Sequence, residues 1–274
     1  MRLRTVVLAG FLSLSMWAVA EAFQAKPPRI PPLEELLARQ NAPVPIPEDF
    51  DEKTEWAFAR VKYPSIRWKW GDLGAKDWEI DSPKAERTFV QGVRRLTRLH
   101  ARSMEEIVTL DDDKVYNWPW IYAVETGHWD LTDAECAKLR DYLLRGGFLM
   151  TDDFHGTVEW STFIASMNRV FPDRPIVDIQ NQDAIFHVLY DLDERFQVPG
   201  IQYWVPGHTV YEKDGFEPKW RAIYDDKGRI MVAICHNMDL GDAWEWSDHP
   251  AYPERYASLA YRIGVNYIIY SMTH

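Results

Sequence analysis

Continuous apolar runs and apolar residues at helical spacing alternate through the middle of the chain. Trp120–Val124 and Phe148–Thr151 are almost entirely apolar, which is typical of strands covered on both faces. Between them, Thr132-Asp133-Ala134-Glu135 has the form of a capping box, and Gly146-Gly147 offers the glycine that favours a helix end. This order predicts a strand, a helix and a second strand.

The pattern continues on the N-terminal side. Trp56–Lys62 alternates between apolar and polar residues and predicts a first strand, and Glu106–Leu110 predicts another short one. Ser82-Pro83 predicts a helix start with Ser82 as the N-cap, because serine is a favoured cap and proline suits the first turn.

The C-terminal side adds a hairpin and a helix. Arg221–Tyr224 and Arg229–Cys235 flank Asp225-Asp226-Lys227-Gly228, which predicts a hairpin. Pro253 predicts the start of a last helix. Strands that alternate with helices predict a three-layer α/β domain with a mainly parallel sheet, to which the hairpin adds an antiparallel part.

The first residues have the pattern of a targeting segment. Arg2 and Arg4 precede an apolar run from Val6 to Ala20, and small residues at cleavage spacing follow. This pattern is typical of a secretory signal peptide, and the run is shorter than the roughly 20 residues that a spanning helix needs. We therefore expect residues 1–22 to be a Sec-type signal peptide and the mature protein to be periplasmic or secreted.

Prolines mark the segment that follows. Seven of the 17 prolines lie between Pro27 and Pro47, which favours a linker or a strap over the domain surface. We expect residues 23–54 to form this Pro-rich arm and residues 55–274 to form a single folded domain.

Composition narrows the classes of partner. The formal net charge is −11 over 274 residues, whereas proteins bind a nucleic-acid backbone through an excess of Lys and Arg, so we expect no nucleic-acid partner. No later segment is long and apolar enough to predict a membrane span. The only cysteines, Cys136 and Cys235, each lie in an apolar pattern and predict two separately buried thiols.

Polar residues follow the two central strands at their carboxyl ends. Because ligands in open α/β sheets bind beyond these ends, such residues are the first candidates for a site. Carboxylates and imidazoles can hold a divalent metal or serve in acid–base catalysis, although the aspartates would alternatively cap the following helix. The candidates are Glu125, Gly127 and His128 after the first strand, and Asp152, Asp153 and His155 after the second.

Five further residues are candidates by position. His236 follows a late strand, as a catalytic histidine or as one that is hydrogen-bonded at a strand end. Arg60 and Tyr63 end the first strand, where Arg60 would bind an anionic ligand or, more economically, neutralise the nearby pair of aspartates. Trp244 and Trp246 lie in an acid-rich segment, where their rings would either stack on a sugar in an open groove or pack internally.

Several stretches together resemble a known family. They are FARVKYPS, GDLGAKDW, FPDRPI, RIGVNYIIYSM and the central block WPWIYAVETGHWDLTDAECAKLRDYLLRGGFLMTDDFHG. Over about residues 55–272 the chain resembles the domain-of-unknown-function family 4159 of bacterial exported or envelope proteins. The resemblance implies a flavodoxin-like core of the class I glutamine amidotransferase-like kind.

The same resemblance bears on catalysis. Glutamine amidotransferases place a nucleophilic cysteine in the tight turn after the strand that corresponds to Phe148–Thr151. This chain has Asp152-Asp153-Phe154 there. The resemblance therefore implies no glutamine amidotransferase activity.

Two classes of function stay open. One is an exported, non-catalytic binding or scaffold module that binds an envelope protein or a glycan through the polar strand ends. The other is a hydrolase acting on a glycan or peptide, with Asp152, Asp153, His128 and His155 as metal ligands or acid–base groups. We expect the first, because the nucleophile and any strong catalytic motif are missing. Whether a divalent metal or another cofactor is bound stays open.

Overall fold

A computed structural model describes most of the chain. The described residues are 35, 38–39, 42–66, 76–204 and 209–274. The predicted signal peptide, residues 1–22, and the first part of the predicted arm lie outside them.

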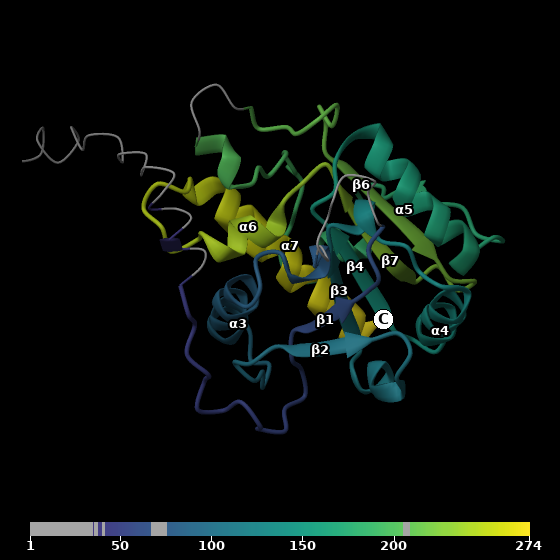
Figure 1. Ribbon diagram of the computed structural model, residues 1–274, viewed down its shortest axis with the longest axis horizontal. Helices are drawn as coiled ribbons and strands as arrows, with labels where there is room; N and C mark the ends of the chain where they lie inside the picture. Colours follow the sequence, from purple (N-terminus) through teal and green to yellow (C-terminus); the bar gives the residue numbers. More distant parts are fainter. Residues whose placement is uncertain (1–34, 36–37, 40–41, 67–75, 205–208) are drawn as a thin grey trace, which may run out of the picture.

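Seven strands form one sheet in the order β2-β1-β3-β4-β7-β6-β5 (Figure 1). The first five strands in this order are parallel, whereas β6 is antiparallel to β7 and β5 is antiparallel to β6. The mainly parallel sheet and the predicted hairpin are therefore confirmed. The strands are β1 (Ala59–Lys62), β2 (Glu106–Thr109), β3 (Trp120–Val124), β4 (Phe148–Asp152), β5 (Val177–Asp178), β6 (Lys219–Tyr224) and β7 (Ile230–His236).

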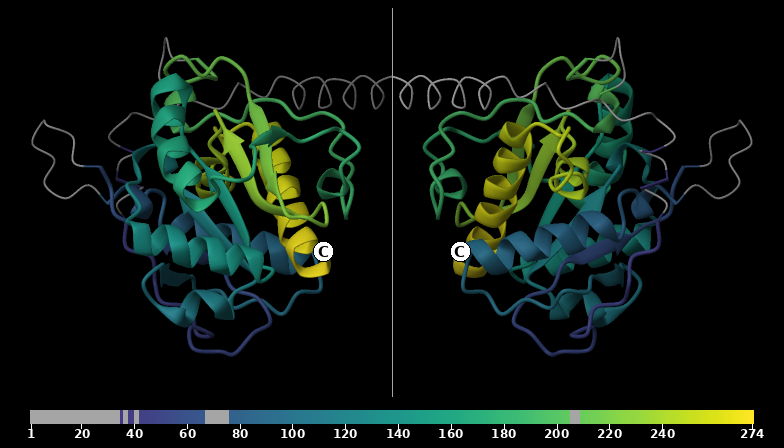
Figure 2. Two further views of the ribbon diagram at one scale, coloured as in Figure 1. Left: turned by 90° about the vertical axis from the view of Figure 1, so that its right-hand side faces the viewer. Right: turned by 90° about the vertical axis from the view of Figure 1, so that its left-hand side faces the viewer.

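Helices cover both faces of the sheet and complete the predicted three layers (Figures 1 and 2). One buried cluster joins the sheet to α3 (Lys84–Leu96), α6 (Leu240–Glu245) and α7 (Glu254–Thr273). A second cluster on the other face joins it to α4 (Asp133–Leu144) and α5 (Gly156–Val170). Short 3-10 helices lie in the connections: η1 (Asp77–Glu79), η2 (Asp113–Asn117), η3 (Thr126–His128), η4 (Ala184–Phe186) and η5 (Ile201–Trp204).

Local signals set the ends of α4 as predicted. The Thr132 hydroxyl accepts from the Glu135 amide at 3.2 Å, and the Glu135 carboxylate accepts from the Thr132 amide at 2.7 Å. Gly146 follows the helix with φ of 109°, a left-handed conformation that glycine adopts without steric cost. The capping box and the glycine stop are both confirmed.

The predicted cap of α3 is wrong by one residue. The N-cap is Pro83 and no side chain caps this helix. Ser82 instead belongs to a turn, in which its amide donates to the Glu79 carbonyl at 3.0 Å. The turn therefore places Ser82 before the helix rather than at its boundary.

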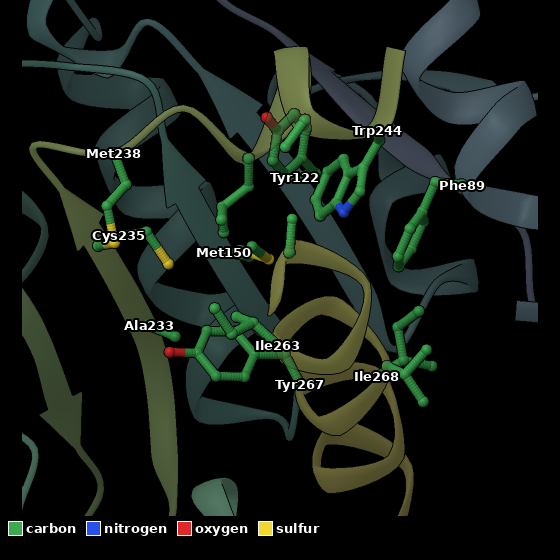
Figure 3. Close-up of a cluster of buried hydrophobic side chains, with 14 of the residues drawn as sticks. Phe89, Tyr122, Met150, Ala233, Cys235, Met238, Trp244, Ile263, Tyr267 and Ile268 are labelled. Atoms are coloured by element: carbon green, nitrogen blue, oxygen red, sulfur yellow. The ribbon is translucent and has the colours of Figure 1, made fainter. Parts of the chain in front are cut away.

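Aromatic rings fix α6 against the sheet (Figure 3). The ring of Trp244 packs between Phe89 of α3 and Tyr122 of β3, with centroid distances of 4.3 and 5.5 Å. Trp244 and Trp246 are both fully buried. The open, sugar-stacking groove considered for these two rings is therefore wrong, because the short helix turns both of them into the core.

Two further predictions are confirmed within the described residues. Cys136 and Cys235 are buried free thiols, and they lie in different core clusters on opposite faces of the sheet. None of the described helices combines the length and the hydrophobicity needed to cross a membrane.

Candidate functional site

The parallel strands bring several loops to one edge of the sheet. Val124 pairs with Asp152 at the ends of β3 and β4, and Thr151 of β4 pairs with Ile234 near the end of β7. Because these strands run in the same direction, the loops that follow them leave the sheet side by side.

Six buried carboxylates gather at this edge, and we name them the acidic basin. None of these residues is more than 8% exposed. One oxygen from each of Asp81, Asp242 and Glu245 lies within 4.8 Å of the others, and the same holds for Asp81, Asp153 and Asp239. The basin comprises Asp81, Asp152, Asp153, Asp239, Asp242 and Glu245.

Hydrogen bonds to backbone amides hold part of the basin in place. The Asp152 Oδ2 atom accepts from the amides of Leu240 at 2.7 Å and Gly241 at 3.0 Å. Asp239 is the N-cap of α6 and accepts from the Asp242 amide at 2.8 Å. Asp152 therefore caps α6. Its predicted role as a cap of the following helix, α5, is wrong, because tertiary contact brings α6 to the end of β4.

Two members of the basin adopt an uncommon backbone conformation. Asp81 and Asp153 have φ of 64° and 53°, in the left-handed region that aspartate tolerates better than most residues. Asp153 is held there by its amide, which donates to the Met238 carbonyl at 3.0 Å. Sharp turns thus contribute both carboxylates.

Arg60 forms its ion pair outside the basin. It is fully buried, and its Nε atom is ion-paired with Glu86. Its Nη1 atom donates to the carbonyls of Trp78 and Ile80 at 3.0 and 2.9 Å. An internal ion pair is therefore confirmed, but the partner is Glu86 rather than the predicted pair of aspartates.

The basin contains oxygens that lack a donor. Among the described residues, Asp81 Oδ2 and Asp152 Oδ1 are buried without a hydrogen-bond partner. Among the described residues, two side chains form ion pairs with basin members: Lys84 Nζ lies 3.8 Å from Glu245 Oε1, and His155 Nε2 lies 3.1 Å from Asp153 Oδ1. One lysine and one histidine face six carboxylates, so the described residues leave most of this negative charge uncompensated.

Burial and mutual repulsion change the acidity of these groups. Burial raises the pKa of Asp152 to about 8, with a further contribution from the Asp153 charge. Burial and the neighbouring Asp242 raise the pKa of Glu245 to about 8. The pKa values of Asp81 and Asp239 are also well above the ordinary range, for the same two reasons. The basin therefore favours protons or a bound cation at neutral pH.

A second group beside the basin is an internally compensated network. His128 lies 3.2 Å from Glu125 through Nδ1 and 3.0 Å from Glu159 through Nε2. Lys213 also pairs with Glu159. Burial alone would raise the pKa of Glu159, but the hydrogen bonds from His128 and Lys213 lower it to about 2. Two cationic partners leave this network with little free negative charge.

His155 joins the basin to a further acid. Its Nε2 atom is 3.1 Å from Asp153 Oδ1 and 3.6 Å from Glu212 Oε1. Its Nδ1 atom is buried and has no hydrogen-bond partner within the described part of the chain. Burial would lower the pKa of His155, but the hydrogen bond with Asp153 and the charge of Glu212 raise it.

His236 is directed away from the basin. Its Nε2 atom donates to the Gly156 carbonyl at 3.1 Å, and its ring packs against Phe154 and Trp160. Burial lowers its pKa to about 4, so the ring is neutral at pH 7. The interpretation as a hydrogen-bonded histidine at a strand end fits this geometry.

Tyr63 and Gly127 shape the loop that carries His128. The Tyr63 hydroxyl donates to the carbonyls of Val124 at 2.6 Å and Glu125 at 2.9 Å. A Cβ atom at Gly127 would lie 2.4 Å from Cβ of Glu159, so only glycine fits here. Both residues position the loop.

Four basin residues were missed by the sequence candidates. Asp239, Asp242 and Glu245 follow the end of β7, so the rule that singled out the ends of β3 and β4 would also have found them. Asp81 precedes α3 and gave no such signal, since only the folded chain brings it to this edge.

Comparison with known protein families identifies the family of this chain. A family model, the domain of unknown function DUF4159, matches residues 57–272. The chain belongs to this family. The DUF4159 match spans the whole sheet and every basin residue, and it leaves the Pro-rich arm outside. No curated protein matches the chain significantly.

Proposed function

We propose that this DUF4159 protein is an exported, non-catalytic binding module whose acidic basin binds a divalent cation. The observation that carries the proposal is the set of six buried carboxylates that face one lysine and one histidine among the described residues. Buried charges are stable when they are paired or coordinate a metal, so an uncompensated group of this size favours a cation.

The donor chemistry indicates the class of cation. The two groups of mutually close atoms within the basin, Asp81–Asp242–Glu245 and Asp81–Asp153–Asp239, are carboxylate oxygens only. Hard cations such as Ca²⁺, Mg²⁺ and Mn²⁺ prefer oxygen ligands, whereas zinc sites in proteins generally include nitrogen or sulfur. We therefore assign the basin to a hard divalent cation.

The proposal also covers the superfamily from which the domain derives and the compartment in which the protein acts. We infer that the domain is a branch of the class I glutamine amidotransferase-like superfamily that has lost the cysteine. The left-handed Asp153 after β4 supports this, because it occupies the tight turn where those enzymes have their nucleophile. We further infer that residues 1–22 direct export, so that the module would meet envelope proteins or glycans outside the cytoplasm.

The test is a cation titration of the full chain. The protein is stripped with chelator and titrated by calorimetry with Ca²⁺, Mg²⁺ and Mn²⁺. We expect a dissociation constant below about 10 μM for at least one of them, within the range of protein sites for hard cations. The proposal would be overturned if the folded protein showed neither binding heat nor stabilisation against thermal unfolding with any of the three cations at 1 mM.

A matched pair of double variants locates the binding. Asp239→Asn with Asp242→Asn should weaken the affinity at least tenfold, because both oxygens belong to the basin. Asp193→Asn with Glu194→Gln removes the same charge from an exposed segment and should leave the affinity unchanged. Equal loss in the two double variants would indicate a nonspecific charge effect and would contradict the assignment.

A second candidate function is metal-assisted hydrolysis. It is favoured by His155, which touches Asp153 and has a buried Nδ1 atom without a partner among the described residues. An imidazole beside a bound cation could move a proton to or from water. A panel of glycan and peptide substrates, assayed with the cation present, should then show hydrolysis that His155→Gln abolishes. If the cation-loaded wild type hydrolyses none of the substrates, the hydrolase is excluded and the binding module remains the proposed function.

A further inference from the structure

Asp81 is the one residue shared by two groups of potential ligands. It belongs to the group with Asp242 and Glu245 and to the group with Asp153 and Asp239. It is 8% exposed, and its Oδ2 atom has no hydrogen-bond partner among the described residues. A carboxylate has two oxygens, so one such residue can bind two cations at once.

We propose that the basin holds two hard divalent cations bridged by the Asp81 carboxylate. This inference rests on the proposed cation-binding function and adds the stoichiometry and the bridge. One cation would be held by Asp81, Asp242 and Glu245, and the other by Asp81, Asp153 and Asp239. Cations that share a carboxylate in known two-metal sites lie about 3.5–4 Å apart.

Two glycines lie directly against oxygens of the basin. A Cβ atom at Gly241 would lie 2.4 Å from Asp81 Oδ2, and a Cβ at Gly200 would lie 2.3 Å from Asp239 Oδ2 and 2.7 Å from Asp242 Oδ2. Neither glycine has a positive φ between 20° and 160°, so backbone strain does not explain them. Each lets carboxylate oxygens approach the main chain closely.

The balance of charge also favours two cations. A single divalent cation would offset two of the six negative charges, and Lys84 would offset one through Glu245. Two divalent cations and this lysine would offset five. The remaining carboxylate, Asp152, is stabilised by the amides at the start of α6. His155 Nε2, 3.1 Å from Asp153 Oδ1, adds a further partner, so two cations leave less uncompensated negative charge in the basin than one.

Mn²⁺ is the probe that tests the number and the bridge together. The chelator-stripped full chain is loaded with Mn²⁺, its bound metal is counted after desalting, and its electron paramagnetic resonance spectrum is recorded at low temperature. We expect two Mn²⁺ per chain and an exchange-coupled spectrum, because a shared carboxylate couples the two ions. One Mn²⁺ with the spectrum of an isolated ion would overturn the bridge and leave the proposed function standing. No bound Mn²⁺, Ca²⁺ or Mg²⁺ would overturn both.

Three isosteric variants separate the two positions. Glu245→Gln removes a ligand of one cation and Asp239→Asn removes a ligand of the other, so each should retain one uncoupled Mn²⁺ per chain. Asp81→Asn removes the bridge and should abolish the coupling and weaken Mn²⁺ binding at least tenfold. Circular dichroism confirms that each variant is folded. A coupled spectrum that persists in Asp81→Asn would contradict the assignment of the bridge.

Discussion

At the scale of single residues, the carboxyl edge is held by side chains that bond to backbone atoms of distant segments. Asp152 contacts the first amides of α6 and the Tyr122 hydroxyl. His236 contacts the Gly156 carbonyl at the start of α5. These bonds fix where the loops lie, and each has a consequence that can be measured.

Asp152→Ala should destabilise the protein by about 2–6 kcal/mol. The reason is that two buried amides lose their acceptor, and each unsatisfied group costs about 1–3 kcal/mol. Asp152→Asn keeps a carbonyl oxygen for both amides and should cost less than about 1 kcal/mol. Urea unfolding in chelator measures both free energies. Equal losses in the two variants would show that the charge, not the acceptor, stabilises this position.

His236 should make the protein less stable in acid. Burial lowers its folded pKa to about 4 from an ordinary value of 6.5, so the unfolded chain takes up this proton first as the pH falls. The stabilisation is complete above pH 6.5 and is lost progressively down to pH 4. Between pH 7 and pH 4.5 this amounts to about 2 kcal/mol.

A variant isolates the contribution of this histidine. His236→Gln keeps an N–H donor near the Gly156 carbonyl and does not titrate. Urea unfolding at pH 7 and pH 4.5 should show a loss about 2 kcal/mol smaller in the variant than in the wild type. The same loss in both proteins would assign the acid sensitivity to other groups.

At the scale of elements, the position of α6 follows from close packing between helices. α7 passes α3 and α6 at Gly264, where an added Cβ atom would lie 2.6 Å from Cζ of Phe89 and 3.1 Å from Cζ2 of Trp244. Figure 3 shows Phe89 and Trp244 beside the helix that carries Ile263. A glycine in the middle of a helix thus permits the approach that places the acids of α6.

Gly264→Ala should destabilise the protein by about 1–3 kcal/mol. Overpacking against Phe89 and Trp244 outweighs the gain in helix propensity, which is at most about 1 kcal/mol. The control is Ser258→Ala on the exposed side of α7, which should change the free energy of unfolding by less than about 0.5 kcal/mol. Denaturant unfolding compares the two, and stabilisation by Gly264→Ala would show that the rings move aside freely.

At the scale of the whole molecule, the basin concentrates negative charge at the meeting point of three segments. The turn before α3, the end of β4 and the start of α6 all contribute carboxylates. Repulsion among these carboxylates destabilises the folded state. A cation that binds only the folded chain reduces this repulsion. Ligand binding and global stability are therefore coupled in this protein.

Saturating cation should raise the melting temperature of the chelator-stripped chain. At a concentration of about 100 times the dissociation constant, the expected stabilisation is about 2.7 kcal/mol. For a domain of this size that corresponds to a rise of about 5–10 °C. Differential scanning calorimetry measures it. The double variant Asp239→Asn with Asp242→Asn should show no comparable rise, and an equal rise there would place the binding elsewhere.

The sequence by itself determined the elements and their layers. Apolar runs identified β3 and β4, and the capping box and Gly146 identified both ends of α4. Such signals are local, because capping and strand burial depend on residues near one another in the chain. Asp152, Asp153 and His155 were found because they directly follow a predicted strand, and the carboxyl ends of parallel strands are a general place for ligands.

Only the tertiary structure decided the partners of these residues. Asp81 reaches the basin through a turn before α3, and Arg60 pairs with Glu86 rather than with the aspartates. Trp244 and Trp246 are buried because α6 packs against α3 and α7. Each of these outcomes depends on contacts between segments far apart in the sequence, and the balance of charge within the buried basin follows from those contacts alone.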